Sequence, residues 1–415
     1  MSEQDQRGTL TSPKVQRLFV FLCWITYFST YLGRLDFTAS LAEISAAEGF
    51  SKSALGMVSS GFFLGYGVFQ LIWGFVGDRM NPIRMVFCGI LGSGLLNLLV
   101  SFCRTVEPMV VLWTLNGMVQ AAVWSPLLRL TLERLPVEQA TKASVGYATT
   151  VPLGTFAAYL LAAGCAVFGS WRTDFRLSGL FLTAIALVWY IAMGKLLPRE
   201  AAVSQVPTAG QQTQGGIPGV VWRLLVPICL ATMVNGLIRD SVQTWMPTYL
   251  SERHGLDGAS SIFLTMALPV VNLSGVYVGT FFNRRLFDNE VLTAGVSFLL
   301  AALLLTPMLL GLSLSYWTAL VLFGLCAAMM LAVNTMFVTL VPVQLQFTRR
   351  TSTLSGILNS ATYLGSTISG YGVGRLLEQS DWGQVLRFWV LGLLAAAFLS
   401  IVLFRFWARQ RGRSA

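Results

Sequence analysis

Apolar segments of roughly 20 residues follow one another along almost the whole chain, and this feature constrains the fold most. A helix needs about 20 apolar residues to cross a hydrocarbon core about 30 Å thick. The apolar runs are continuous, whereas the strands of a membrane β-barrel alternate apolar and polar residues. Only 11% of the 415 residues are charged, against about 25% in soluble domains. We therefore predict an all-α polytopic membrane protein and exclude a soluble enzyme.

About twelve such helices fit the sequence, in two sets of six. The first set is predicted at 18–41, 54–77, 83–103, 108–130, 143–168 and 177–197. The second set is predicted at 222–250, 260–282, 291–311, 315–341, 353–377 and 384–407. Residues 198–221 between them are rich in Pro, Gly, Gln, Ser and Thr, which is linker composition. The predicted parts are a tail (1–17), a six-helix bundle (18–197), a linker (198–221), a second six-helix bundle (222–407) and a tail (408–415).

Basic residues predict how the chain is oriented. Most of its 28 lysines and arginines fall in the tails, the linker and the loops on the same side of the predicted helices. Cytoplasmic loops carry such an excess, so both termini, the tails and the linker are expected in the cytoplasm. The net charge of +10 then reflects these loops rather than a nucleic-acid partner. Compact loops and short tails favour a multi-pass protein of a bacterial inner membrane, and we expect a monomer in the lipid bilayer.

Two pairs of arginines indicate that the halves repeat. The interval from Arg34 to Arg239, within predicted helices 1 and 7, equals the interval from Arg79 to Arg284, after predicted helices 2 and 8. A common offset is expected if each half descends from one six-helix unit. The fold is therefore predicted to be two pseudo-symmetric bundles.

Arg34 and Arg239 are the main candidates for function. An arginine near the bilayer midplane costs at least about 2.5–3.5 kcal/mol, so it persists where it lines a cavity or meets a partner. Its planar fork of donors suits a carboxylate or a phosphate. One arginine from each bundle would form a midplane clamp for a small-molecule anion.

The alternative is an internal ion pair with Asp36 and Asp240, which lie in the same helices. Neighbouring positions on a helix point apart, so neither aspartate is expected to face the arginine beside it. The expected pairs are instead Arg34 with Asp240 and Arg239 with Asp36, across the bundles. In that case the aspartates would act in gating or coupling.

Polar side chains near the arginines predict a water-filled cavity. They recur at helical spacing on several predicted helices, which places them on one face of each. Any one of these polar side chains could instead form a hydrogen bond between membrane helices. The predicted substrate-binding set around the two arginines is Tyr31, Gln70, Gln120, Asn235, Gln243, Asn359 and Tyr363.

At these positions the chain resembles the major facilitator superfamily, and within it the organophosphate:phosphate antiporter family. The resemblance covers most of the chain and rests on the stretches at 31–37, 48–51, 66–67, 78–82, 117–129 and 239–250. It implies the major facilitator fold, with Arg34 and Arg239 as paired anion-binding arginines. It also implies a gating role for Asp78 and Arg79 in the loop after the second helix.

Three positions depart from that family's pattern. Gln70 stands where its phosphate transporters usually have a lysine, Thr150 where its glycerol-phosphate carriers have a histidine, and Gly236 where they have a tyrosine. Fewer charged groups fit a monovalent anion, such as a carboxylate, better than a phosphate dianion. The two aspartates would then bind a proton or a cationic part of the substrate.

The sequence therefore predicts a secondary active transporter of a small organic anion, an organophosphate or a carboxylate, working by alternating access. It would be an antiporter or a proton-coupled symporter, with phosphate or a proton as counter-substrate. The alternatives are a proton-coupled transporter of a drug or other non-phosphate solute, and a membrane sensor of sugar phosphate. We expect no catalytic residues, metal or cofactor: there is one histidine, no CxxC and no GxxxxGK[ST] loop.

Overall fold

The computed structural model describes residue 10 and residues 12–77, 80–147, 149–197, 219–265, 268–345 and 351–411. These residues form helices and connecting turns, with no strand among them, as predicted. The first half contains α1 (Pro13–Glu48), α2 (Lys52–Gly77), α3 (Pro82–Val100), α4 (Val106–Gln120), α5 (Trp124–Arg134), α6 (Val137–Tyr147), α7 (Thr150–Phe168) and α8 (Trp171–Leu196).

The second half follows the same scheme. It contains α9 (Gly219–His254), α10 (Gly258–Thr265), α11 (Leu268–Phe281), the π-helical turn η3 (Phe282–Phe287), α12 (Glu290–Leu309), α13 (Tyr316–Asn334), the π-helical turn η4 (Thr335–Leu340), α14 (Val341–Gln344), α15 (Thr351–Gln379) and α16 (Trp382–Arg411). Residues 198–218, most of the predicted linker, lie outside the described residues.

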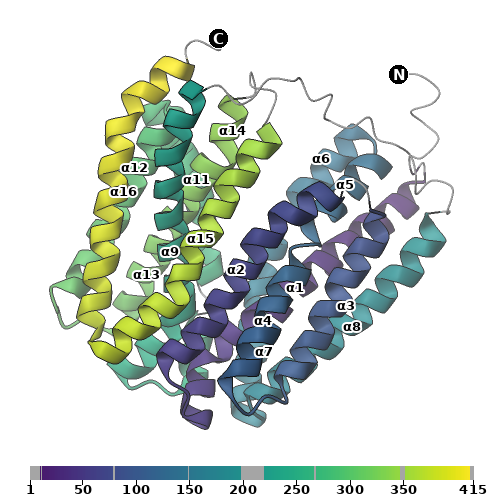
Figure 1. Ribbon diagram of the computed structural model, residues 1–415, viewed down its shortest axis with the longest axis horizontal. Coiled ribbons are helices and arrows are strands. Elements are labelled where there is room, and N and C mark those ends of the chain that lie inside the picture. The colour runs from purple at the N-terminus through teal and green to yellow at the C-terminus, as the bar shows by residue number, and fades with distance from the viewer. Residues whose placement is uncertain are drawn as a thin grey trace.

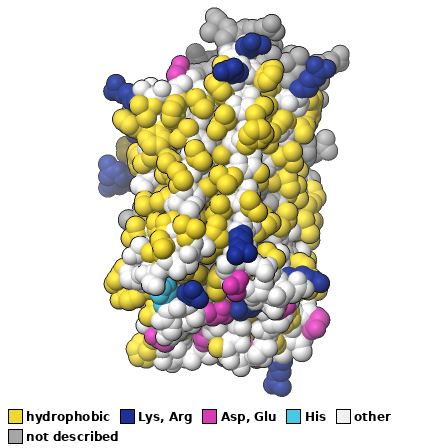
Figure 2. Space-filling model, turned by 90° about the vertical axis from the view of Figure 1, so that its left-hand side faces the viewer, with side chains coloured by type: hydrophobic (Ala, Val, Ile, Leu, Met, Phe, Trp, Pro, Cys, Tyr) yellow, Lys and Arg dark blue, Asp and Glu magenta, His cyan; other side chains and the backbone are white. Residues whose placement is uncertain are grey.

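The surface is that of a membrane protein. Among the described residues, ten helices are long and apolar enough to cross a bilayer. Apolar side chains cover the middle of the face in Figure 2, while charged side chains gather toward its two ends. Large exposed side chains such as Leu303, Leu391 and Phe398 would be costly in water and are stable against lipid. The protein is therefore a multi-pass membrane protein.

Helices α1–α8 and α9–α16 lie on opposite sides of the molecule (Figure 1). The main contacts across the middle join α2 to α15, α1 to α9, and α7 to α10 and α11. The helix that begins the first half and the helix that ends the second, α1 and α16, have their outer termini at the same end of the molecule. This arrangement agrees with two six-helix units, although their exact boundaries stay a prediction.

Local chemistry sets where the helices turn at the end away from the termini. α1 ends at Gly49, whose φ of 68° is left-handed and favours glycine. The chain then re-enters the membrane as α2 from Lys52. Here two polar contacts, which we call the latch, join the two halves. Lys52 Nζ lies 2.7 Å from Glu252 Oε1, and the backbone N–H of Ser53 donates to Glu378 Oε1 at 2.8 Å.

Glycines allow α2 and α15 to touch backbone to backbone just inside this latch. A Cβ atom on Gly56 would lie 2.2 Å from the carbonyl oxygen of Gly370, and one on Gly370 would lie 2.4 Å from that of Gly56. A Cβ on Gly374 would lie 2.4 Å from the carbonyl oxygen of Lys52. Any larger side chain at these positions would force the two helices apart.

Candidate anion site

A cavity of about 220 Å³ lies between the two halves, and three of the six predicted charged site residues line it. Its wall includes Tyr31 and Arg34 from α1, and Arg239, Asp240 and Gln243 from α9. Tyr363 of α15 is the remaining predicted residue that lines the cavity. The structure therefore brings the two candidate arginines together, and the two guanidinium groups are close enough to interact electrostatically.

Arg34 is held by aromatic faces rather than by a carboxylate. Its guanidinium carbon lies 4.9 Å from the ring centre of Tyr31 and 5.0 Å from that of Tyr66. Cation–π contacts of this kind stabilise a cation while leaving its N–H donors available. Among the described residues Arg34 makes no ion pair, and its Nε atom has no hydrogen-bond partner. Its fork of donors is suited to an incoming anion.

Arg239 is paired with its own neighbour in the chain. Its Nε donates to Asp240 Oδ1 at 2.7 Å and its Nη2 to Asp240 Oδ2 at 3.0 Å. The expectation that adjacent residues cannot face each other was wrong here, because the long arginine side chain folds back along the helix to reach Asp240. The cross-bundle pairs of Arg34 with Asp240 and Arg239 with Asp36 are not formed among the described residues.

Gln120 was predicted to line the cavity, and this was wrong. It is 2% exposed and bonds within the first bundle, where its Nε2 donates to the Gly33 carbonyl at 2.9 Å. Asn97 and Asn116 donate to the same carbonyl at 3.1 and 2.8 Å. Three amides therefore bond this one carbonyl of α1, so Gln120 stabilises the packing of the first bundle.

Three other predicted residues also lie outside the cavity wall. Asn359 Nδ2 donates to Gln70 Oε1 at 2.8 Å, so these two amides join α2 to α15. Asn235 is fully buried in α9, and neither polar atom of its amide has a hydrogen-bond partner. The prediction from spacing alone that these residues line the cavity was wrong: Gln70 and Asn359 bond each other between two helices, and Asn235 is buried within the packing of α9.

The predicted gating residues separate into three cases. Asp240 lines the cavity, as described above. Asp36 is 1% exposed, does not line the cavity, and interacts electrostatically with Asp174, a buried residue of α8. Asp78 and Arg79 lie outside the described residues.

Sequence reasoning missed the aromatic residues of the cavity wall. Phe62 and Phe63 of α2 and Trp113 of α4 line the cavity, and Tyr66 lies beside Arg34. The spacing of Phe62 and Tyr66, four positions apart on one helix face, was an available signal. The wall makes the cavity largely apolar away from its charged groups, which strengthens the electrostatic interactions within it.

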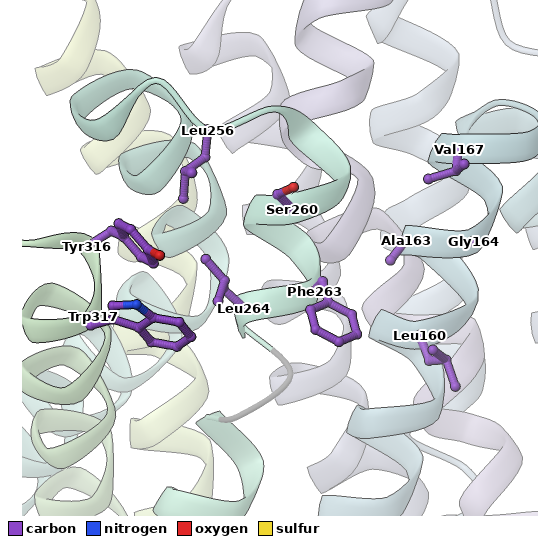
Figure 3. Close-up of a pocket in the computed structure, with 10 residues that line it drawn as sticks. All are labelled: Leu160, Ala163, Gly164, Val167, Leu256, Ser260, Phe263, Leu264, Tyr316 and Trp317. Atoms are coloured by element: carbon purple, nitrogen blue, oxygen red, sulfur yellow. The ribbon is translucent and has the colours of Figure 1, made fainter.

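A second cavity, of about 510 Å³, lies between α7, α10 and α13 (Figure 3). Its wall contains leucines, Phe263 and Trp317, and its polar groups are hydroxyls such as that of Ser260. In this view the Phe263 ring of α10 lies toward α7, the helix that carries Leu160 and Ala163. The described residues of its wall carry no charged group, so it does not suit a small anion.

Comparisons with known proteins show which family the sequence resembles. The sequence profile of the Major Facilitator Superfamily matches residues 21–370. The chain is 23% identical to the Membrane sensor protein UhpC of Escherichia coli (strain K12) over 96% of this chain and 94% of that protein. It is 22% identical to a Probable hexose phosphate transport protein of Chlamydia pneumoniae over 97% and 93% of the two chains.

The fold has close counterparts among solved structures. A bacterial homolog of the human lysosomal transporter Spinster, in an inward-facing and unoccupied conformation, superposes with a TM-score of 0.75. The identity is 14%, and the match covers 97% of this chain and 98% of that one, so the likeness shows the fold alone. With the profile spanning most of the sequence, the chain belongs to the Major Facilitator Superfamily.

Proposed function

We propose that this protein is a secondary active transporter of a small organic anion, with the anion bound between Arg34 and Arg239. The observation that carries the proposal is the cavity itself, which unites one arginine from each half behind an apolar wall. Relatives named for sugar-phosphate transport and sensing support an anionic ligand. Tyr31, Gln243 and Tyr363 complete the binding site.

Alternating access follows from where the site lies. A ligand held by groups from both halves is released to either side when the halves rock about it. The latch of Lys52 with Glu252 and the glycine contact of Gly56 with Gly370 must open for one of these movements. We propose that this latched end faces the outside, since the basic tails and linker belong in the cytoplasm. Asp36 and Asp240 remain candidates for coupling to a proton, and phosphate for a counter-substrate.

The test is transport by reconstituted protein. Arg34→Lys and Arg239→Lys should each reduce anion uptake into proteoliposomes at least about 10-fold, because lysine keeps the charge and loses the planar fork. Both variants should remain monodisperse and helical. Uptake at the unaltered rate in either variant would show that the arginine pair does not bind the anion.

A second candidate function is sensing, which the full-length similarity to a membrane sensor protein favours. A sensor would bind an anion through the same arginines without moving it. Counterflow separates the two functions: a transporter exchanges labelled for unlabelled anion across the vesicle membrane, and a sensor shows binding alone.

A further inference from the structure

We propose that Asp240 is a built-in counter-anion that restricts the site to substrates with a single negative charge. The inference rests on the proposed function, since it concerns what the arginine pair accepts. It names the substrate class as organic monoanions, such as monocarboxylates, in preference to phosphate-ester dianions. Asp240 is then a specificity-determining residue.

Asp240 is held where the second charge of a dianion would have to bind. Both of its carboxylate oxygens accept from Arg239, at 2.7 and 3.0 Å, which uses the fork of that arginine. Ser366 of α15 donates a further hydrogen bond to Oδ2. Because Asp240 is tethered one residue away, it competes with any free anion at a high effective concentration.

Charge balance in the cavity then leaves room for one negative charge. Among the described residues, the charged groups of its wall are Arg34, Arg239 and Asp240, and the other titratable groups of the wall are Tyr31, Tyr159 and Tyr363. With Arg239 neutralised by Asp240, Arg34 is the one cation of the described wall that makes no ion pair. A monoanion neutralises Arg34. A dianion would leave a surplus negative charge in a site bounded by apolar side chains, which is unfavourable.

Nothing else in the described surroundings supplies the missing cation. Gln70, at the position where related phosphate transporters have lysine, is bonded to Asn359 rather than facing the cavity. Thr150 is fully buried, and its hydroxyl donates to the carbonyl of Tyr147 at 2.6 Å. The neutral residues Gln70 and Thr150 supply no cation, and Asp240 neutralises Arg239, so little positive charge is left for a substrate.

The experiment compares anions that share a body and differ in charge. Glycerate and glycerol 3-phosphate form one pair, and glucuronate and glucose 6-phosphate form another. Dissociation constants are measured by calorimetry on the purified full-length protein at pH 7.5, for the unaltered chain and for Asp240→Asn. The amide of Asn keeps a group of the same shape and removes the charge. Asp174→Asn, which alters a buried carboxylate of α8 that does not line the cavity, is the matched control.

The unaltered protein should bind each monoanion at least about 10-fold tighter than its dianion partner. Asp240→Asn should raise the dianion-to-monoanion affinity ratio about 10- to 100-fold, the effect expected for one unit charge about 6–12 Å away at an effective dielectric of about 20. Asp174→Asn should leave the ratio within about two-fold, since Asp174 lies on α8 and does not line the cavity.

A measurement on the unaltered protein keeps the proposal testable if Asp240→Asn does not fold. The second ionisation of a phosphate ester has a pKa of about 6, so at pH 5.5 most of it is a monoanion. Glycerol 3-phosphate should therefore bind more tightly at pH 5.5 than at pH 7.5, and glycerate should change much less.

Either of two results overturns the proposal: dianions bind as tightly as monoanions at pH 7.5, or the ratio is the same in Asp240→Asn as in the unaltered protein. Both leave the proposed function intact, because an anion still binds. If no anion of either charge binds, or if binding survives Arg34→Lys, the proposed function fails instead.

Discussion

The glycine contact between α2 and α15 yields a prediction that can be worked from distances. A Cβ atom on Gly370 would lie 2.4 Å from the Gly56 carbonyl oxygen, whereas ordinary contact begins at 3.4 Å. The neighbouring atoms are a backbone carbonyl and Ser60, so the helices must move apart by about 1 Å. We expect Gly370→Val to destabilise the latched state and favour the state that opens at this end.

The size of the shift follows from the cost of overpacking. Adding methyl groups to a well-packed contact costs about 1–3 kcal/mol, which corresponds to about a 5- to 150-fold change in the ratio of the two states. Gly372→Val is the matched control on the same helix. A Cβ there meets only Ile368 of its own helix, at 3.4 Å, so the ratio should stay near that of the unaltered protein.

Accessibility of the cavity from the latched end, which we propose faces the outside, reports this ratio. Ser59 of α2 lines the cavity and is 3% exposed, so Ser59→Cys should react slowly with a membrane-impermeant thiol reagent while the latch is closed. The rate, corrected for the native cysteines, should rise in Gly370→Val and not in Gly372→Val. Equal rates in all three proteins would refute the argument that this contact holds the end closed.

Two further predictions separate structural roles from binding roles. Gln120→Ala should lower the melting temperature, since lost buried hydrogen bonds cost about 0.5–1.5 kcal/mol each, and should leave the anion dissociation constant nearly unchanged. Gln243→Ala, in the cavity wall, should instead raise the anion dissociation constant and leave the melting temperature nearly unchanged. Glu252→Gln should change the outside labelling rate of Ser59→Cys less than about five-fold, because its ion pair with Lys52 is partly exposed and such pairs contribute about 0–1 kcal/mol. The latter effect should shrink further in high salt. A large, salt-independent effect of Glu252→Gln, or a binding defect in Gln120→Ala, would contradict these assignments.

The fold and the central arginines followed from the sequence because both carry signals that packing does not alter. Long apolar runs leave a helical membrane protein as the stable solution, and a buried arginine requires a cavity or a partner. Arg34 and Arg239 accordingly share one cavity wall.

The neutral polar residues were harder to place because an amide is stable in a cavity or between two helices. Gln120 bonds the Gly33 carbonyl, and Gln70 bonds Asn359, at spacings that also fit a water-facing stripe. The pairing of Arg239 with Asp240 depends on the side-chain conformation of a long, flexible residue, which spacing along a helix does not determine. The aromatic partners of Arg34 come from separate helices and required the tertiary structure.

The central claim is that an anion binds through Arg34, and thermal stabilisation tests it most directly. A ligand that binds the folded state alone must raise the melting temperature. The purified protein and Arg34→Lys are heated with carboxylates, phosphate esters, inorganic phosphate and cationic drugs. We predict that organic anions raise the melting temperature of the unaltered protein and that the rise is lost in Arg34→Lys. Stabilisation by cationic drugs alone, or by anions equally in both proteins, would contradict the account.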